Sequence, residues 1–164
     1  GLPAAALVFL LDVGKGIAAV IVARLLFADD PLVEWAAAVA GFAAIVGHNW
    51  SAFIRFTGGR GVATSAGALG AMSPWTILVI APIVIGLIWR TRYVSLGSIT
   101  GGLLAPVITG ALWLGGLASI PAIVYALASG LLVTAAHADN IARLRAGTER
   151  RIGHTEAVRT DGPG

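Results

Sequence analysis

An uncharged stretch in the middle of the chain decides the fold. It reads Val-Ala-Thr-Ser-Ala-Gly-Ala-Leu-Gly-Ala-Met-Ser (residues 62–73), followed by Pro-Trp-Thr-Ile-Leu-Val-Ile-Ala-Pro-Ile-Val-Ile-Gly-Leu-Ile-Trp (residues 74–89). A helix needs about 20 apolar residues to cross a bilayer. Residues 62–73 fall short of that length, so we expect a half-length helix enclosed by its neighbours. Ser73-Pro74 predicts a turn, after which residues 75–89 run back across the membrane.

The overall composition also indicates a membrane protein. Apolar residues make up 57% of the chain and charged residues only 12%, whereas about a quarter of an ordinary soluble domain is charged. The isoelectric point near 10.2 reflects few acids and arginines at helix ends, which favours a topology signal over nucleic-acid binding. Because the chain has no cysteine and its histidines are scattered, we predict no metal site.

Further apolar stretches predict an all-α, polytopic membrane bundle of about six transmembrane or half-length helices. The predicted segments are 3–28, 35–54, 62–73, 75–89, 99–116 and 119–136. A short amphipathic helix beginning at His137 should lie on the membrane surface. We expect residues 1–152 to form one membrane-embedded domain and residues 153–164 a disordered cytoplasmic tail.

Counting crossings places three polar segments on one side of the membrane: Gly58–Gly61, Arg90–Ser98 and His137–Arg151. Nearly all the arginines lie there, and the positive-inside rule makes that side cytoplasmic. Within the first span, Asp12 and Lys15 are three residues apart on one helical face and can form an ion pair. That pair either aids packing or takes part in a site, and both readings stay open.

The segment Gly47–Thr64 predicts an anion site at a membrane surface. Gly58, Gly59 and Gly61 surround Arg60 and let the backbone approach a ligand closely. The helix expected after them would offer its free N–H groups to an anion. The segment is not a P-loop, which needs Lys-Ser/Thr after its last glycine. Anchoring in a membrane does not call for flanking glycines, so we predict that Arg60 binds a phosphate.

The other polar segments add hydrogen-bonding groups on the same side. Arg92 is followed by Ser95 and Ser98, and His137 precedes Asn140 by three residues. Such groups suit a phosphate monoester or an acyl phosphate. Other arginines at helix ends are interpreted as topology anchors, namely Arg90, Arg143 and Arg145.

Lone histidines at the ends of spans, such as His48, are more often packed and hydrogen-bonded than catalytic. For His137, the Asn140 partner on the same helical side favours a functional role. A Ser-His-Asp triad is not indicated, because no serine lies in a nucleophile-elbow sequence.

Four segments, taken in order, resemble one family. They are Leu11-Asp-Val-Gly-Lys-Gly16, Gly47-His48 leading to Phe56-Thr-Gly-Gly-Arg-Gly-Val-Ala-Thr64, Thr91-Arg-Tyr-Val-Ser-Leu-Gly-Ser98, and His137-Ala-Asp-Asn-Ile-Ala-Arg-Leu-Arg-Ala-Gly-Thr-Glu149. Over almost the whole chain, this pattern resembles the acyl-phosphate:glycerol-3-phosphate acyltransferases (PlsY family). The resemblance implies a multi-pass enzyme of the bacterial inner membrane with seven helices, a cytoplasmic active site and C-terminus, and no metal or nucleotide cofactor.

The implied reaction moves a fatty acyl group from acyl phosphate to the 1-hydroxyl of glycerol 3-phosphate, giving lysophosphatidic acid and phosphate for phospholipid synthesis. The implied partners are these two substrates and membrane lipids, with no nucleic acid. The resemblance implies catalytic roles for Arg60, His137 and Asn140. It implies substrate or phosphate binding by Gly58, Gly59, Gly61, Thr64, His48, Arg92, Ser95, Ser98, Lys15 and Glu149.

The sequence departs from the family pattern at two points. Arg60 stands where the family usually has lysine, and because arginine cannot act as a general base we expect an electrostatic role. The family's usual first helix and its Gly-Ser-Gly-Asn-x-Gly-Ala-Thr-Asn loop are absent, so we expect activity to require such a segment upstream. The alternatives are an inactive homologue and a small-anion transporter. The transporter's expected inverted repeat is not evident, because Gly58–Thr64 has no counterpart in the other half.

Overall fold

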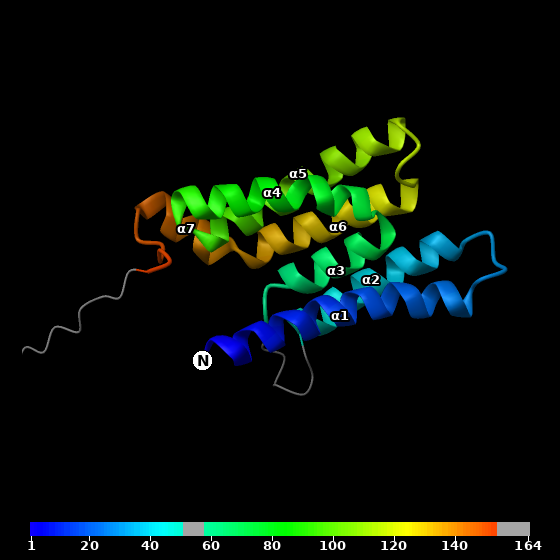
Figure 1. Cartoon of the computed structure of the whole chain (residues 1–164), viewed down its shortest axis with the longest axis horizontal. Coiled ribbons are helices and arrows are strands. Elements are labelled where there is room, and N and C mark those ends of the chain that lie inside the picture. Colours follow the sequence, from blue (N-terminus) through cyan, green and yellow to red (C-terminus); the bar gives the residue numbers. More distant parts are fainter. Residues whose placement is uncertain (51–57, 154–164) are drawn as a thin grey trace, which may run out of the picture.

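The computed structural model describes residues 1–50 and 58–153. In these ranges the ordered elements are helices (Figure 1). They are α1 (Leu2–Leu26), α2 (Val33–Asn49), α3 (Val62–Met72), α4 (Pro74–Thr91), α5 (Val94–Leu114), α6 (Ile120–Ala136) and α7 (Ala138–Ala146). The predicted end of the second span, residues 51–54, and the predicted tail after Gly153 lie outside the described residues.

The helices form the expected polytopic membrane bundle. Three helical segments are long and apolar enough to cross a membrane: Pro3–Leu26, Pro74–Thr91 and Val94–Leu114. The helices α6 and α7 are long enough to cross only as a pair, and that pair is bent by 58°. Large apolar side chains cover the outside, among them Leu26 at 74% and Trp89 at 82% exposure. Such surfaces are costly in water and suit contact with lipid tails.

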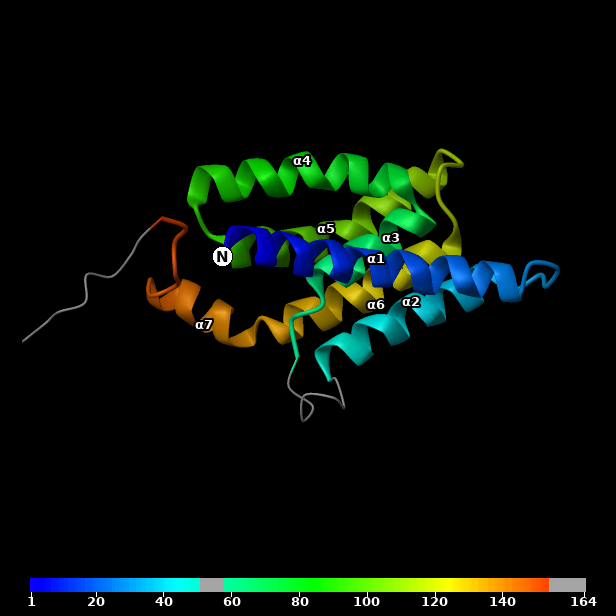
Figure 2. The same cartoon turned by 60° about the horizontal axis from the view of Figure 1, so that its bottom comes forward.

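The short helix α3 lies in the middle of the bundle, as its length predicts (Figures 1 and 2). It contacts α1, α2, α4 and α6. Two glycines set its contact with α1: a Cβ atom at Gly16 would overlap the carbonyl oxygen of Thr64, and one at Gly67 would overlap that of Val13. The two backbones therefore touch, as small residues allow in membrane helices.

We expect Gly67→Ala to destabilise the bundle, because the added methyl group would press against the α1 backbone. Overpacking of this kind typically costs about 1–3 kcal/mol. Gly14→Ala is the matched control, since nothing lies within 4 Å of a Cβ atom there. Thermal unfolding in detergent should give a lower midpoint for Gly67→Ala and an unchanged or higher one for Gly14→Ala. Equal midpoints would contradict close packing of α1 on α3.

Hydrogen bonds from Arg24 link three helices at the end of α3 that lies away from Arg60. The Nε and Nη2 atoms of Arg24 each donate to one carboxylate oxygen of Glu34 at 2.9 Å, and Nη1 donates to the carbonyl oxygen of Ala71 at 2.8 Å. This bidentate pair joins α1 to α2 and also satisfies a carbonyl in the last turn of α3. These contacts hold the last turn of α3 against α1 and α2.

The polar connector predicted for Arg90–Ser98 is wrong in its extent. The helix α4 continues to Thr91, whose hydroxyl donates to the carbonyl oxygen of Leu87 at 2.7 Å. Arg92 then takes a left-handed conformation with φ 62°, and α5 begins at Val94. Ser95 and Ser98 therefore lie in the first turns of a helix. Packing of α5 overrides the polar, β-branched local sequence that is typical of a loop.

Candidate active site

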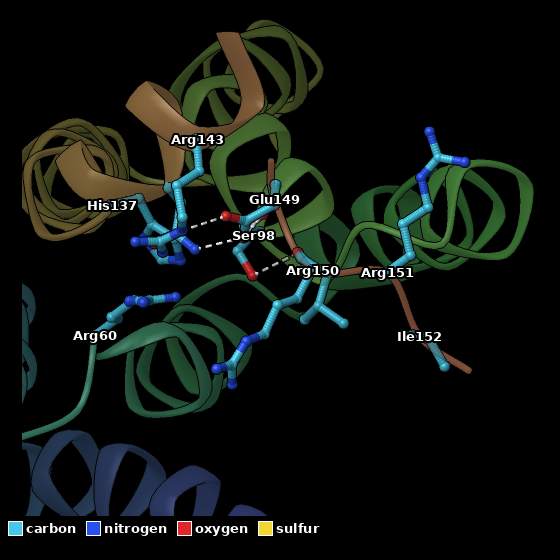
Figure 3. A pocket seen from close by; sticks show the side chains of 11 residues that line it. Arg60, Ser98, His137, Arg143, Glu149, Arg150, Arg151 and Ile152 are labelled. Carbon is cyan, nitrogen blue, oxygen red and sulfur yellow. Dashed lines mark hydrogen bonds and ion pairs between the residues drawn. The ribbon is translucent and has the colours of Figure 1, made fainter. Parts of the chain in front are cut away.

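Residues from distant parts of the chain line a pocket of about 590 Å³ (Figure 3). They come from the segment just before α3, the first turns of α5, the end of α6, the helix α7, and the segment after α7. The lining residues are Arg60, Val94, Ser95, Ser98, His137, Asn140, Arg143, Glu149, Arg150, Arg151 and Ile152. The structure thus brings together six of the predicted site residues: Arg60, Ser95, Ser98, His137, Asn140 and Glu149.

A glycine turn after α7 brings Glu149 into this pocket. Gly147 ends α7 with φ 70°. The amide of Gly147 donates to the carbonyl oxygen of Leu144 at 3.2 Å, and that of Thr148 donates to the carbonyl oxygen of Arg143 at 2.9 Å. This C-cap, which glycine favours, reverses the chain. The following residues, 148–153, form a C-terminal strap that folds back over the starts of α5 and α7.

Glu149 is the centre of a hydrogen-bond cluster. Its Oε1 atom accepts from Ser95 Oγ at 2.7 Å and from Asn140 Nδ2 at 2.6 Å, and its Oε2 atom accepts from Arg143 Nε at 2.8 Å. Burial raises the pKa of Glu149, but these three hydrogen bonds and the charge of Arg143 outweigh it and lower the pKa to about 2. The carboxylate is therefore ionised at neutral pH. Arg143, interpreted from the sequence as a topology anchor, in fact pairs with Glu149.

The ionised carboxylate fixes the orientation of the Asn140 amide. A carboxylate only accepts hydrogen bonds, so the NH₂ group of Asn140 must face Glu149 and its Oδ1 atom must face the other way. Asn140 is 3% exposed, and Oδ1 has no hydrogen-bond partner among the described residues. A buried acceptor without a partner is costly, and a ligand hydroxyl would satisfy it. The hydroxyl proton of Ser95, by contrast, is already donated to Glu149.

His137 offers a second acceptor to the pocket. The residue is 2% exposed and caps the end of α6, where its Nδ1 atom lies 2.7 Å from the carbonyl oxygen of Val133. Because a carbonyl can only accept, Nδ1 must carry the proton, which leaves the lone pair of a neutral ring on Nε2. Figure 3 shows the side chain of Arg60 beside the His137 ring.

Arg60 supplies positive charge to the pocket. It is exposed and directly precedes Gly61, which caps α3 with φ 71°. No hydrogen bond or ion pair joins Arg60 to another side chain in the part of the chain that the structure describes. The guanidinium group is therefore able to bind an external anion in a bidentate manner.

The glycines around Arg60 pack against the end of α2. A Cβ atom at Gly58 would overlap the His48 carbonyl oxygen, and one at Gly59 would overlap the His48 ring. One at Gly61 would lie 2.5 Å from Ile45 and 2.7 Å from the Asn49 side chain. Tight packing thus explains these glycines, and phosphate binding by their amides stays a prediction.

The predicted ion pair in α1 is confirmed and extends to α2. Lys15 Nζ lies 2.6 Å from Asp12 Oδ1 and also contacts His48 Nδ1, which lies 3.3 Å from the same oxygen. This cluster does not line the pocket. Thr64 is fully buried and Arg92 also lies outside the lining, so substrate contacts by Lys15, His48, Thr64 and Arg92 stay predictions.

Sequence reasoning missed Arg150, Arg151, Val94 and Ile152 as pocket residues. From the sequence alone, the two arginines are interpreted as part of a basic tail. Only the turn at Gly147 brings them back to the pocket. An arginine directly after a predicted site residue, Glu149, was the available signal.

The lowered pKa of Glu149 predicts that docking of the strap depends on pH. Because the folded-state pKa is lowered from 4.5 to about 2, the carboxylate contributes its full stabilisation above pH 4.5 and loses it as the pH falls towards 2. The amide of Ile152 reports on docking, since it donates to the carbonyl oxygen of Arg92 at 2.9 Å. We expect its protection from hydrogen exchange to fall across this range. Glu149→Gln should show weaker protection that varies little with pH; a parallel decline in both proteins would contradict the assignment.

Comparisons with known proteins identify the family. A profile described as glycerol-3-phosphate acyltransferase matches residues 1–147. A glycerol-3-phosphate acyltransferase of Thermoanaerobacter sp. (strain X514) is 38% identical over 159 residues, covering 97% of this chain and 76% of the relative. One from Thermus thermophilus is 43% identical over 148 residues, covering 90% of this chain and 70% of the relative. The chain belongs to the glycerol-3-phosphate acyltransferase family.

Solved structures of glycerol-3-phosphate acyltransferases share the fold. The crystal structure of PlsY (YgiH), an integral membrane glycerol 3-phosphate acyltransferase, in its glycerol 3-phosphate form matches with a TM-score of 0.77 and 34% identity, over 90% of this chain and 70% of that one. Its lysophosphatidic acid form matches with the same TM-score and identity, over 90% and 72%. The protein is therefore an integral membrane acyltransferase.

Proposed function

We propose that the protein transfers a fatty acyl group from acyl phosphate to the 1-hydroxyl of glycerol 3-phosphate, giving lysophosphatidic acid and phosphate. One observation carries this proposal: a cation, Arg60, lines the same pocket as two acceptors, His137 Nε2 and Asn140 Oδ1. Glycerol 3-phosphate has a dianionic phosphate group, which suits the cation, and two hydroxyl groups, which can donate to the two acceptors. Crystal structures of the related PlsY in glycerol 3-phosphate and lysophosphatidic acid forms support the same choice.

In this proposal, Arg60 neutralises a phosphate group, and His137 and Asn140 accept hydrogen bonds from the glycerol hydroxyls. The 1-hydroxyl oxygen attacks the acyl carbonyl carbon and gives its proton to His137 Nε2. The bond from that carbon to the phosphate oxygen breaks, its electron pair stays with the oxygen, and phosphate leaves with the proton that His137 passes on. Acyl phosphate is already activated, so alignment and charge neutralisation supply most of the catalysis. Glu149 orients the Asn140 amide and holds Ser95 and Arg143 in place.

The acyl chain would reach this pocket from the lipid. Val94 and Ile152, which line the pocket, are 51% and 53% exposed. These apolar side chains stand beside the arginines, as a substrate with a charged head and an apolar tail requires.

The proposed location is the bacterial inner membrane, with the pocket on the cytoplasmic side. Figure 1 shows α7 and the start of α1 at one end of the bundle, opposite the loop between α1 and α2. The pocket is lined by residues of α7 and of the strap after it, so it belongs to that end. Four arginines line it, whereas that loop carries Asp29 and Asp30. The positive-inside rule favours this orientation.

Paired assays separate acyl transfer from transport of a small anion. Membranes containing the protein are incubated with acyl phosphate and radiolabelled glycerol 3-phosphate, and label is followed into the lipid fraction. Liposomes containing the protein are tested for uptake of the same label without a donor. We expect labelled lipid and no uptake above protein-free liposomes. Uptake without lipid labelling would support a transporter instead.

A further inference from the structure

The C-terminal strap holds Arg150 between two anchors. On one side, Glu149 accepts hydrogen bonds from Ser95, Asn140 and Arg143. On the other side, Arg151 Nε donates to the Tyr93 hydroxyl at 2.8 Å, and the Arg151 guanidinium carbon lies 5.0 Å from the centre of the Tyr93 ring. The backbone at position 150 is therefore fixed from both directions.

The other cations of the pocket already have partners. Arg143 pairs with Glu149, and Arg151 lies over Tyr93 at cation–π distance. In the part of the chain that the structure describes, neither Arg60 nor Arg150 takes part in an ion pair or a side-chain hydrogen bond. Both line the pocket. Two arginines that share one pocket without an acidic partner create a strong local positive potential.

The side-chain directions agree with a shared ligand. Figure 3 shows the guanidinium groups of Arg60 and Arg150 on the same side of the pocket, with Ser98 between the two segments that carry them, while Arg151 points away. Arg60 comes from the segment that leads into α3, and Arg150 comes from the strap. An anion between them would draw these two segments together.

We propose that Arg150 is a second phosphate-binding residue of the pocket, which acts with Arg60 on a phosphate monoester or an acyl phosphate. The inference rests on the proposed function, in which both substrates bring a phosphate. Each of two planar guanidinium groups can form paired hydrogen bonds with a dianion. A single arginine would balance only one of the two negative charges. The alternative is that Arg150 only anchors the chain at the membrane surface.

The test uses Arg150→Gln and Arg150→Lys in the full-length protein, with Arg145→Gln as the matched control. Arg145 is also exposed, and it lies in the last turn of α7 but does not line the pocket. The KM for glycerol 3-phosphate and that for acyl phosphate are measured separately, together with kcat. Independently of activity, the rise in thermal midpoint on adding inorganic phosphate measures anion binding, and the midpoint without phosphate checks folding.

For Arg150→Gln we expect the KM for one phosphate substrate to rise about 10-fold, because one charge-assisted contact with the substrate is lost. The phosphate-induced shift in midpoint should shrink, Arg150→Lys should be intermediate and Arg145→Gln should resemble the parent protein. The substrate whose KM rises identifies the bound phosphate.

Unchanged KM values for both substrates and an unchanged phosphate-induced shift in Arg150→Gln would overturn the assignment. Equal losses in Arg145→Gln would favour the anchoring reading and overturn it too. Failure of the proposed function gives a different pattern. The parent protein would then form no acyl product, while phosphate still stabilised it and Arg150→Gln reduced that effect.

Discussion

Arg60→Ala is expected to lower kcat/KM for acyl transfer by roughly 100- to 1,000-fold, the usual cost of losing a preorganised charged group that stabilises the transition state. Its guanidinium group faces the pocket without an acidic partner among the described residues. The phosphate of the substrate would lose both charge neutralisation and paired hydrogen bonds. Steady-state kinetics on purified protein in detergent measure the effect.

Two further variants show which property of Arg60 the activity requires and whether the loss is specific to the pocket. Arg60→Lys should retain part of the activity, because the charge stays and the planar fork is lost. Arg90→Ala is the matched control, since Arg90 is exposed near the end of α4 and does not line the pocket. Arg60 is exposed, so its removal should leave the thermal midpoint unchanged. Near-normal turnover in Arg60→Ala would remove this residue from the site.

His137→Ala is expected to lower kcat by roughly 100- to 10,000-fold, the range for a group that directs proton transfer. The variant loses the Nε2 acceptor together with the ring that Val133 orients. His137→Gln, which keeps polar atoms near both positions, should lose less. The neighbouring control is Asp139→Asn, an exposed residue of α7 that does not line the pocket.

Because His137 also caps α6, the measurement must separate folding from chemistry. A thermal midpoint and the binding of glycerol 3-phosphate are recorded for each variant beside kcat. The proposed role requires that kcat fall far more than the midpoint or the binding constant explains. A drop in kcat that simply follows loss of folded protein would reduce His137 to a structural role.

Features set by length and spacing could be predicted from the sequence. The run 62–73 is too short to cross a bilayer, and the structure places it as the enclosed helix α3. The three-residue spacing of Asp12 and Lys15 predicts their ion pair, which forms at 2.6 Å. The pattern around Arg60 and the spacing of His137 and Asn140 predict side chains that do meet at one pocket.

Features that depend on chain reversals or on packing could not be predicted in this way. The pairing of Arg143 with Glu149 requires the left-handed turn at Gly147, which redirects the strap. Ser95 belongs to a helix although its local sequence is typical of a loop. The site geometry therefore depends on tertiary contacts that no single stretch of sequence encodes.

The central claim, acyl transfer from acyl phosphate, is tested most directly by stoichiometry and choice of donor. Purified full-length protein receives glycerol 3-phosphate with either acyl phosphate or an acyl thioester, and lysophosphatidic acid and inorganic phosphate are measured together. The proposed mechanism predicts both products in equal amounts from acyl phosphate and neither from the thioester, with both lost in Arg60→Ala. Lysophosphatidic acid formed from the thioester alone, or phosphate released without acylation, would contradict it.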